Sequence, residues 1–380
     1  MKNKTVVFTG GGTGGHIYPG LAVADSLREI YDGQIVWLGS SAGMDRNLVE
    51  KSGICDKFIG IPSGKLRRYF SLKNISDIFR IIAGCVSSFF ILLKLKPQLL
   101  FSKGGFVSVP PCLAAKLLHI PVYTHECDFS PGLATKLNSK SATQILLTYA
   151  ETADFLSESA KKKVIVTGNP VRSVFYTANA LDGLAFLGIE KTEKPVLFVL
   201  GGSGGAKQIN DIVLENLEWL CEHYIVVHQT GISAENQMHE TQQSALIERL
   251  KTEKKYLPFQ FIYNEMPSVQ ACCDVIFSRA GANTLWEAIA TEKPLVLLPL
   301  AGSGTRGDQV ENAAFLEKKG AAIVIKNGQG ESEAAKAALE KMLDKTARER
   351  YSEAIKKLKG KEQASKVIAQ IILNTIIKQD

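Results

Sequence analysis

The segment Thr9-Gly10-Gly11-Gly12-Thr13-Gly14-Gly15-His16 joins a strand-like run to a helix-like run. Residues 5–8 before it are β-branched or aromatic, and residues 19–27 after it carry apolar side chains at helical intervals. Its glycines allow positive φ angles and turn backbone N–H groups toward a ligand, at a helix start whose dipole favours anions. The segment therefore predicts a strand, a loop that binds a phosphate or another oxyanion, and a helix.

The length of 380 residues allows two domains, each with its own core, and the composition is that of a soluble protein. Met1-Lys2-Asn3-Lys4 leads straight into a strand-like run without the apolar run of a signal peptide, which favours a cytoplasmic location. The seven cysteines form no C-x-x-C pair and no zinc-like spacing with the six histidines. Neither a metal site nor a disulfide framework is expected.

A second glycine loop follows a second strand-like run in residues 195–206 (Pro-Val-Leu-Phe-Val-Leu-Gly-Gly-Ser-Gly-Gly-Ala). Strand-like and helical runs alternate along the chain, which predicts an α/β fold with two parallel sheets covered by helices. The other expected strands are residues 34–38, 99–102, 122–125, 145–147, 164–167, 224–229, 275–278, 295–300 and 322–325.

The domain boundary is predicted at Gly168-Asn169-Pro170, where a strand-like run ends in turn residues. This gives an N-terminal domain of residues 1–170 and a C-terminal domain of residues 171–359. Residues 333–380 have helical spacing with a break at Gly360. The last helix, about 360–380, can cap either domain and can pack back on the first.

Basic residues are concentrated in the first half of the chain. Residues 1–171 hold 20 Lys and Arg against 12 Asp and Glu, whereas the rest holds 25 against 26. Residues 65–96 combine seven basic residues and one acid with many aromatic and aliphatic side chains. This segment is either an ordinary covering helix or, as we favour, an amphipathic surface for anionic lipid. Its longest uncharged stretch, residues 81–93, is shorter than the roughly 20 residues that span a bilayer, so we expect it to lie on a membrane.

Two common nucleotide-binding motifs fit poorly. Gly10, Gly12 and Gly15 satisfy G-x-G-x-x-G, but the expected second strand ends in Gly39-Ser40-Ser41 and carries no acidic residue for a ribose. Neither glycine loop is followed by the G-K-[ST] of a Walker A motif.

Polar residues gather at the expected strand ends of the first half. His16 directly follows the glycine loop, where it is either structural or a general base whose pKa the helix N-terminus lowers. Gly104-Gly105 follows the strand 99–102, and His125-Glu126-Cys127-Asp128 ends the strand 122–125. Because parallel strands end at one edge of a sheet, these loops should converge on one cleft.

The second half offers a similar set. Glu287 follows a small-residue turn after the strand 275–278; it is either a surface glutamate or an acceptor for a ribose diol. Asp308 and Gln309 lie in a polar loop and helix start, where their side chains can form hydrogen bonds with sugar hydroxyls.

Taken together, these motifs resemble the MurG family of bacterial N-acetylglucosaminyltransferases over nearly the whole chain. The matching motifs are residues 11–16 with 19–22, 104–108, 125–126, 168–172, 201–206, 278–282, and 308–309 with Asn312. The resemblance implies a GT-B architecture, in which two Rossmann-like parallel-sheet domains face a cleft. It implies inverting transfer of GlcNAc from UDP-GlcNAc to the 4-hydroxyl of MurNAc in undecaprenyl-linked lipid I, which gives lipid II for peptidoglycan, cell shape and cell division.

The resemblance also implies roles for individual residues. UDP-GlcNAc would contact Ser203 and Gly204 at the pyrophosphate, Glu287 at the ribose, Arg172 near the uracil, and Ala282, Asp308 and Gln309 at the sugar, with further contacts from Thr13, Gly14, Gly15 and Asp128. The acceptor diphosphate would contact Gly12, Thr13, Gly14, Gly104 and Gly105. His16 is our candidate base, with Glu126 and Asp128 as alternatives. No cofactor, metal or nucleic-acid partner is implied.

Two positions depart from the family pattern. Many members have His-Glu-Gln-Asn where this chain has His125-Glu126-Cys127-Asp128, and a Gln-Gln pair where it has Asp308-Gln309. Both changes keep an oxygen acceptor and lose an amide donor, which weakens the sugar-reading assignment of Asp128 and Asp308. Two alternative functions stay open: another GT-B transferase with a diacylglycerol or small soluble acceptor, and a UDP-sugar-binding or epimerising protein.

A lipid-linked acceptor would explain why residues 65–96 are rich in basic and aromatic side chains. We expect peripheral attachment to the anionic, cytoplasmic face of the inner membrane. The residues expected to contact lipid are Arg67, Arg68, Phe70, Phe79, Arg80, Phe89 and Phe90.

Overall fold

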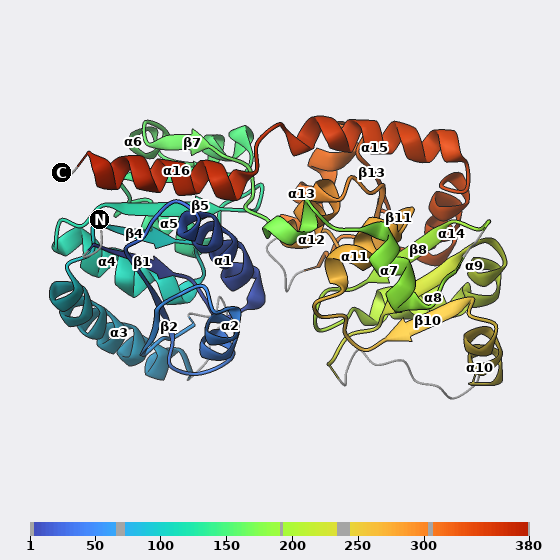
Figure 1. Ribbon diagram of the computed structural model, residues 1–380, viewed down its shortest axis with the longest axis horizontal. Helices are drawn as coiled ribbons and strands as arrows, with labels where there is room; N and C mark the ends of the chain where they lie inside the picture. Colours follow the sequence, from blue (N-terminus) through green and yellow to red (C-terminus); the bar gives the residue numbers. More distant parts are fainter. Residues whose placement is uncertain (1–3, 66–72, 191–192, 234–243, 303–306, 379–380) are drawn as a thin grey trace. The chain divides into compact units, whose positions relative to one another are not determined.

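The computed structural model describes residues 4–65, 73–190, 193–233, 244–302 and 307–378 (Figure 1). The chain forms two compact units: unit 1 comprises residues 1–173 and 362–380, and unit 2 comprises residues 174–361. The domain boundary expected from the sequence lies between residues 170 and 171. Each unit is an α/β domain with a parallel sheet, as predicted.

Unit 1 is built on a seven-stranded parallel sheet, counted over the described residues, with the order β3-β2-β1-β4-β5-β6-β7. Its strands are β1 (Thr5–Thr9), β2 (Gln34–Ser40), β3 (Lys57–Ile61), β4 (Leu99–Ser102), β5 (Val122–Glu126), β6 (Gln144–Leu147) and β7 (Val164–Val166). Its helices are α1 (Gly14–Arg28), α2 (Asp45–Ser52), α3 (Lys73–Leu95), η1 (Phe106–Ser108), α4 (Val109–Leu117), α5 (Leu133–Asn138), η2 (Ala150–Phe155), α6 (Glu158–Lys161) and α16 (Ala364–Ile377), and η3 (Ser173–Phe175) begins at its boundary.

The central strands of unit 1 are buried on both faces, which explains their unbroken apolar runs. On one face, Phe8 and Trp37 pack with residues of α1 and α16. On the other face, Val7 and Leu100 pack with residues of α3 and α4. The strand order reverses between β1 and β4, and ligands of open parallel sheets bind beyond the strand ends at such a point.

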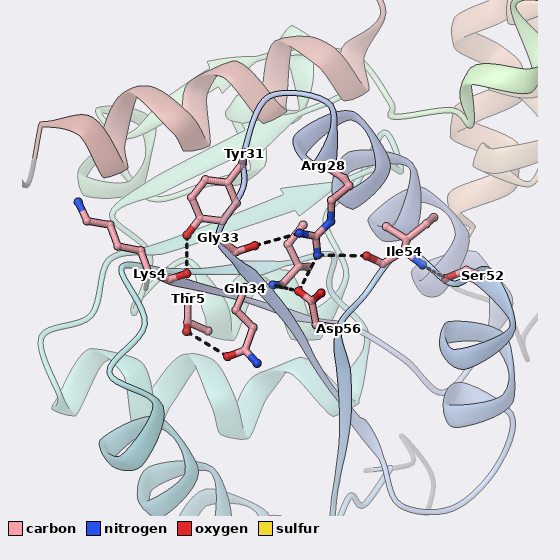
Figure 2. A network of polar contacts seen from close by, with 10 residues as sticks. Lys4, Thr5, Arg28, Tyr31, Gly33, Gln34, Ser52, Ile54 and Asp56 are labelled. Atoms are coloured by element: carbon pink, nitrogen blue, oxygen red, sulfur yellow. Dashed lines mark hydrogen bonds and ion pairs between the residues drawn. The ribbon is translucent and has the colours of Figure 1, made fainter. Parts of the chain in front are cut away.

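A polar network at the opposite edge of this sheet fixes the end of α1 (Figure 2). The guanidinium of Arg28 donates to Gly33 O at 2.9 Å and to Asp56 Oδ2 at 2.6 Å. The same Oδ2 accepts the N–H of Ile35 at 2.7 Å, and the Tyr31 hydroxyl donates to Lys4 O at 2.8 Å. The C-terminal end of α1 is thereby tied to the strand starts, which leaves its N-terminus at the strand ends.

Unit 2 has a six-stranded parallel sheet, counted in the same way, with the order β10-β9-β8-β11-β12-β13. Its strands are β8 (Val196–Leu200), β9 (Ile225–Gln229), β10 (Tyr256–Phe259), β11 (Val275–Ser278), β12 (Leu295–Leu297) and β13 (Ala322–Val324). Its helices are α7 (Ala180–Leu187), α8 (Lys207–Glu215), α9 (Leu217–His223), α10 (Ser244–Thr252), α11 (Met266–Cys272), α12 (Ala282–Ala290), α13 (Asp308–Lys318), α14 (Glu331–Lys341) and α15 (Lys345–Lys359).

The helical C-terminal region is divided at two places. Besides the break expected at Gly360, Asp344 caps α15 by accepting the N–H groups of Thr346 and Ala347. Helix α16 packs along α1, where the hydroxyls of Ser26 and Ser365 form a buried hydrogen bond of 3.0 Å. The last helix therefore belongs to unit 1.

Candidate active site

The glycine loop of unit 1 links β1 to α1. Thr13 precedes α1 in an extended conformation, so the helix begins at Gly14 and points its first N–H groups at the loop. The indole N–H of Trp37 donates to Gly10 O at 3.1 Å. These contacts place Thr13, Gly14 and Gly15 at a helix N-terminus, where an anion is favoured.

Asp45, the first residue of α2, holds this loop in place and was missed by sequence reasoning. The Asp45 side chain is fully buried; its Oδ1 accepts the N–H of Gly12 and its Oδ2 accepts the N–H of Ser40, each at 2.9 Å. The expected contact of Gly12 with a diphosphate needs correction, because its N–H already has this partner. Asp45 lies 33 residues after Gly12 in the sequence. Its position at the start of a helix is the one sequence signal that could have pointed to this role.

The second glycine turn packs against the first. Gly104 and Gly105 both have positive φ, 87° and 77°. A Cβ added at Gly105 would lie 2.7 Å from Cδ2 of His16, and one added at Gly12 would overlap the Phe106 ring. The glycines at these positions therefore let the imidazole of His16 lie directly on the second turn, as the convergence of the strand ends predicted.

Glu126, an alternative base in the sequence analysis, holds its own loop. Its Oε1 accepts the N–H groups of Cys127 and Asp128 at 2.8 and 3.0 Å, and its Oε2 accepts the N–H of Gly132 at 3.0 Å. Glu126 is only 5 % exposed. Because both oxygens are engaged by backbone donors, the structure favours a loop-holding role, and His16 and Asp128 stay as candidate bases.

His125 lies beside this loop and is buried. Its Nε2 is 2.9 Å from Gly168 O, so this nitrogen carries the proton. Burial, together with the charge of Lys103, lowers the pKa of His125 well below its usual value. The neutral ring therefore joins the end of β5 to the segment that follows β7.

The ligand atoms of Glu126, Cys127 and Asp128 lie within 4.8 Å of one another, which is close enough to hold a metal ion. The three backbone hydrogen bonds to Glu126 leave little lone-pair capacity for such an ion. Burial raises the pKa of the Cys127 thiol to about 12, which disfavours the thiolate that metals bind. These residues fit a metal poorly.

Arg172, expected near the uracil, lies at the end of unit 1. Its guanidinium carbon is 5.1 Å from the ring centroid of Tyr18 on α1. The next residue, Ser173, donates to Asp25 Oδ2 at 3.4 Å. The start of the connection to unit 2 is thus docked on the helix that carries the glycine loop.

The glycine loop of unit 2, between β8 and α8, is packed closely against the end of β9. A Cβ added at Gly205 would overlap Thr230 O, and the φ of Gly205 is 80°. The buried amide of Gln229 donates to Gly202 O at 3.3 Å and accepts the N–H of Ile262 at 2.9 Å. Gln229, which the sequence analysis did not single out, therefore joins two loops at this edge.

Helices α12 and α13 begin side by side in unit 2. Asn312 donates to Ala280 O at 3.3 Å and ties α13 to the turn before α12. Ala282 is buried at the first position of α12, and Glu287 lies half-buried on its second turn. Asp308 and Gln309 open α13, where Oε1 of Gln309 accepts the N–H of Leu300 at 2.9 Å.

A cavity of about 830 Å³ lies within unit 2, large enough for a nucleotide sugar. It brings the glycine loop together with Arg279 and Gln309 and with the start of α14. The residues that line it include Gly201, Gly205, Gln208, Arg279, Gln309 and Glu331. The exposed Ser203, and Gly204, Ala282 and Glu287, are not among the described residues that line it.

Helix α3 carries the surface that the sequence associated with lipid. Phe79 and Phe90 are 68 % and 62 % exposed. The side chain of Arg80 is 64 % exposed. Phe89 is half-buried and packs partly against the core between α3 and α4. The expected residues Arg67, Arg68 and Phe70 lie outside the described residues.

By length and composition alone, residues 76–95 of α3 are long and apolar enough to cross a membrane, with a mean hydropathy of 2.0. The uncharged stretch alone, residues 81–93, is too short for this. In the structure α3 contacts α4 and β3, and Leu92, Asp77 and Ser88 are buried. One face of the helix therefore belongs to the domain core, and the apolar residues of the other face are exposed.

Comparison with known proteins identifies the family. The glycosyltransferase family 28 N-terminal domain matches residues 6–147, and the family's C-terminal domain matches residues 196–371. The chain belongs to glycosyltransferase family 28. Family 28 enzymes transfer sugars, so the chain is a glycosyltransferase, as predicted.

Individual relatives of this family 28 chain agree with the resemblance to MurG. It is 54% identical over 328 residues to the UDP-N-acetylglucosamine--N-acetylmuramyl-(pentapeptide) pyrophosphoryl-undecaprenol N-acetylglucosamine transferase of Treponema denticola, covering 85% of this chain and 84% of that protein. Its fold is similar to that of MurG from Acinetobacter baumannii (TM-score 0.70, 24% identity, 98% and 99% of the two chains). It is also similar to that of the UDP-GlcNAc 2-epimerase from Methanocaldococcus jannaschii (TM-score 0.65, 16% identity, 98% and 100%). The two structures show the GT-B fold alone.

Proposed function

We propose that this family 28 enzyme transfers GlcNAc from UDP-GlcNAc to the 4-hydroxyl of MurNAc in lipid I, undecaprenyl-pyrophosphoryl-MurNAc-pentapeptide, and so makes lipid II. The observation that carries the proposal is the 54% identity with the Treponema denticola transferase, whose name gives this donor and this acceptor. The residues around the glycine loops supply groups that such a reaction needs.

The transfer inverts the configuration at C1 of GlcNAc. The acceptor oxygen forms a bond to C1 while the bond from C1 to the diphosphate breaks, and the electron pair of that bond leaves with UDP. His16 takes the proton of the attacking hydroxyl. Its close contact with Gly105 supports this role, because it places the imidazole where the two glycine turns of unit 1 meet at the strand ends.

The departing diphosphate needs positive potential. The glycine loop of residues 201–206, in which the Gly205 N–H already donates to Gly202 O, and the N-termini of α12 and α13 offer it in unit 2. Ser203, exposed in that loop, adds a hydroxyl donor, and Glu287 accepts the ribose hydroxyls. In unit 1, Thr13, Gly14 and Gly15 hold the acceptor diphosphate at the start of α1, and Arg172 is the residue that the resemblance assigns to the uracil.

The enzyme works at the cytoplasmic face of the inner membrane. The exposed apolar side chains of α3 support attachment there; besides Phe79 and Phe90 they are Ile78, Ile82, Val86 and Leu93. Arg80 on the same helix attracts anionic headgroups. Such a surface keeps the transferase near an acceptor whose undecaprenyl chain stays in the bilayer.

One incubation tests donor, acceptor and metal requirement together. The purified chain is mixed with UDP-GlcNAc and a short-chain lipid I analogue, with and without EDTA. We expect the disaccharide product and UDP in both samples. Epimerisation of UDP-GlcNAc without acceptor, or transfer to diacylglycerol or a small soluble acceptor but not to the lipid I analogue, would replace the proposal by one of the alternatives.

A further inference from the structure

The second glycine turn of unit 1, Gly104-Gly105, is held by two buried serines. Ser102, the last residue of β4, accepts the N–H of Gly104 on its Oγ at 3.2 Å. Ser108, the last residue of η1, donates its hydroxyl to Gly105 O at 2.8 Å. Both serines are fully buried. The turn is therefore fixed at its first N–H and at its last carbonyl, by one hydroxyl each.

Asn138, the last residue of α5, joins the two serines. Its Nδ2 donates to Ser102 Oγ at 3.1 Å and to Ser108 Oγ at 2.8 Å. The hydroxyl of Ser108 gives its own proton to Gly105 O, so the bond between Asn138 and Ser108 needs its proton from the amide. The NH2 group of the amide therefore faces the serines, and each of its two hydrogens is used once.

The oxygen of the same amide is a cost to the fold. Among the described residues, Asn138 Oδ1 has no hydrogen-bond partner, and the residue is 1 % exposed. A buried polar atom without a partner is unfavourable, and an apolar side chain of similar size, such as leucine, would avoid the penalty. The asparagine is therefore better explained by what its N–H groups hold than by the packing of α5.

The turn that the amide holds is the surface against which His16 lies. A Cβ added at Gly105 would lie 2.7 Å from His16 Cδ2 and also 2.7 Å from Gly11 O. The imidazole and the first glycine loop are thus both in contact with one residue of the turn. The position of the turn consequently decides where the ring of His16 lies.

We propose that Asn138 is a positioning residue, which fixes the Gly104-Gly105 turn through the two serines and so holds the imidazole of His16 in place for proton transfer. Without the amide, the serines lose the donor that they share, and the turn is no longer fixed against the imidazole. A displacement of about 1 Å in a reacting group can cost about a hundredfold in rate. The proton-transfer part of this inference rests on the proposed function.

Asn138→Leu tests the kinetic part, because leucine keeps the size of the side chain and removes both N–H groups. It should lower kcat by about tenfold to a hundredfold and leave the KM of UDP-GlcNAc unchanged. Asn138→Ala, a smaller side chain that also lacks the donors, should act in the same direction.

A double-mutant cycle shows whether the effect passes through His16. In a chain that already carries His16→Ala, Asn138→Leu should lower kcat by less than about threefold, because the group that it positions is gone. Losses that multiply in the double variant would overturn the proposal.

Ser139→Ala is the matched control. Ser139 is the next residue along the chain, also buried, and its hydroxyl donates to Lys136 O at 2.9 Å. The substitution removes a hydrogen bond at the end of the same helix and leaves the amide of Asn138 in place, so kcat should stay close to that of the wild type. A loss as large as that of Asn138→Leu would assign the effect to α5 as a whole and contradict the positioning role.

The imidazole resonances in an NMR spectrum give a readout that needs no turnover. The chain has six histidines, and the resonance of His16 is the one that His16→Ala removes from the spectrum. This resonance should shift in Asn138→Leu and stay in place in Ser139→Ala. An unchanged resonance in Asn138→Leu would overturn the proposal even if kcat falls. If the wild-type chain transfers no GlcNAc, the proposed function fails, and the spectrum still decides whether Asn138 positions His16.

Discussion

The carboxylate of Asp45 and the backbone N–H of Gly12 are joined by a hydrogen bond of 2.9 Å, so the start of α2 holds the glycine loop of unit 1. The second oxygen of the carboxylate accepts the N–H of Ser40 at the end of β2. A side chain at Gly11 would overlap this carboxylate. The loop is thus built around a buried acid, which limits its anion-binding part to residues 13–15.

Replacing Asp45 tests this arrangement. Asp45→Ala leaves two N–H groups without their acceptor, and we expect it to lower the free energy of unfolding by about 3 kcal/mol. The acceptor KM should rise, because the loop is released. Urea denaturation measures the stability. Asp211→Ala is the control, since Asp211 pairs with Lys207 on the surface and its loss should cost less than about 1 kcal/mol. Equal losses in the two variants would contradict the anchoring role.

The base assignment predicts a large kinetic effect at His16. His16→Ala should lower kcat by about 10²- to 10⁴-fold while the circular dichroism spectrum and the Tm stay close to wild type. His119→Asn is a suitable control because His119 is exposed and has a φ of 57°, which asparagine tolerates. Near-normal turnover by His16→Ala would transfer the role to Asp128.

The packing of the second glycine loop predicts a difference between two neighbouring glycines. Gly202 and Gly205 both have positive φ, 90° and 80°, so alanine strains both backbones. Only at Gly205 would the new Cβ also overlap the chain, at Thr230 O, whereas Gly202 has open space around it. Gly205→Ala should therefore weaken UDP binding by about tenfold more than Gly202→Ala, as measured by calorimetry. Equal affinities would show that the loop adapts to the overlap.

Membrane attachment depends on the exposed face of α3. The variant Phe79→Ser with Phe90→Ser removes two aromatic side chains, each worth at least about 1.5 kcal/mol when buried in lipid, so binding to vesicles should fall about a hundredfold. Flotation with anionic and neutral vesicles measures it, and anionic vesicles should bind the wild type more strongly. Leu181→Ser on the exposed surface of unit 2 is the control. Unchanged flotation of the double variant would remove α3 from the contact surface.

Buried His228 predicts a loss of stability in acid. Burial lowers its pKa to about 3, and its ring is held by Tyr256 and Asn210. Between about pH 6.5 and pH 3 the unfolded chain binds a proton at this site that the folded chain does not, so stability falls as the pH falls, by about 1.4 kcal/mol per unit. His125 acts in the same direction.

The variant His228→Gln isolates that contribution. The free energy of unfolding is measured by urea denaturation at several pH values between about 7 and 5. Its slope against pH should be smaller for the variant, by the amount that corresponds to about one bound proton. Identical slopes in the variant and the wild type would mean that His228 is protonated without unfolding.

Much of the fold follows from patterns that lie within short stretches. The strands before both glycine loops and those at residues 99–102 and 275–278 were expected within a residue of their observed ends. The edge strands β3 and β10 were missed. Their sequences, Lys-Phe-Ile-Gly-Ile and Tyr-Leu-Pro-Phe, contain a glycine or a proline, and edge strands tolerate both because they pair on one side only.

The candidate site could be predicted where the residues of a motif lie directly at the end of a strand. The meeting of His16 with Gly104 and Gly105 follows from parallel strands that end at one edge. Asp45 and Gln229 were not predicted, because each acts on a loop from another element and neither stands in a recognisable motif. The hydrogen bonds of Glu126 were not predicted either, because its carboxylate is engaged by backbone N–H groups, whose direction a sequence does not reveal.

Helix α16 supplies Ile368, Ile372 and Ile376 to a core whose strands come from the first half of the chain. On the ribosome, β1 emerges long before α16, and the whole of unit 2 is made in between. Unit 2 is continuous in sequence and can fold as it appears, whereas unit 1 must wait with an apolar surface beside α1 until the last helix is released. A chain that terminates early, before Ala364, would be left with this surface uncovered and would be a natural target for chaperones and proteases.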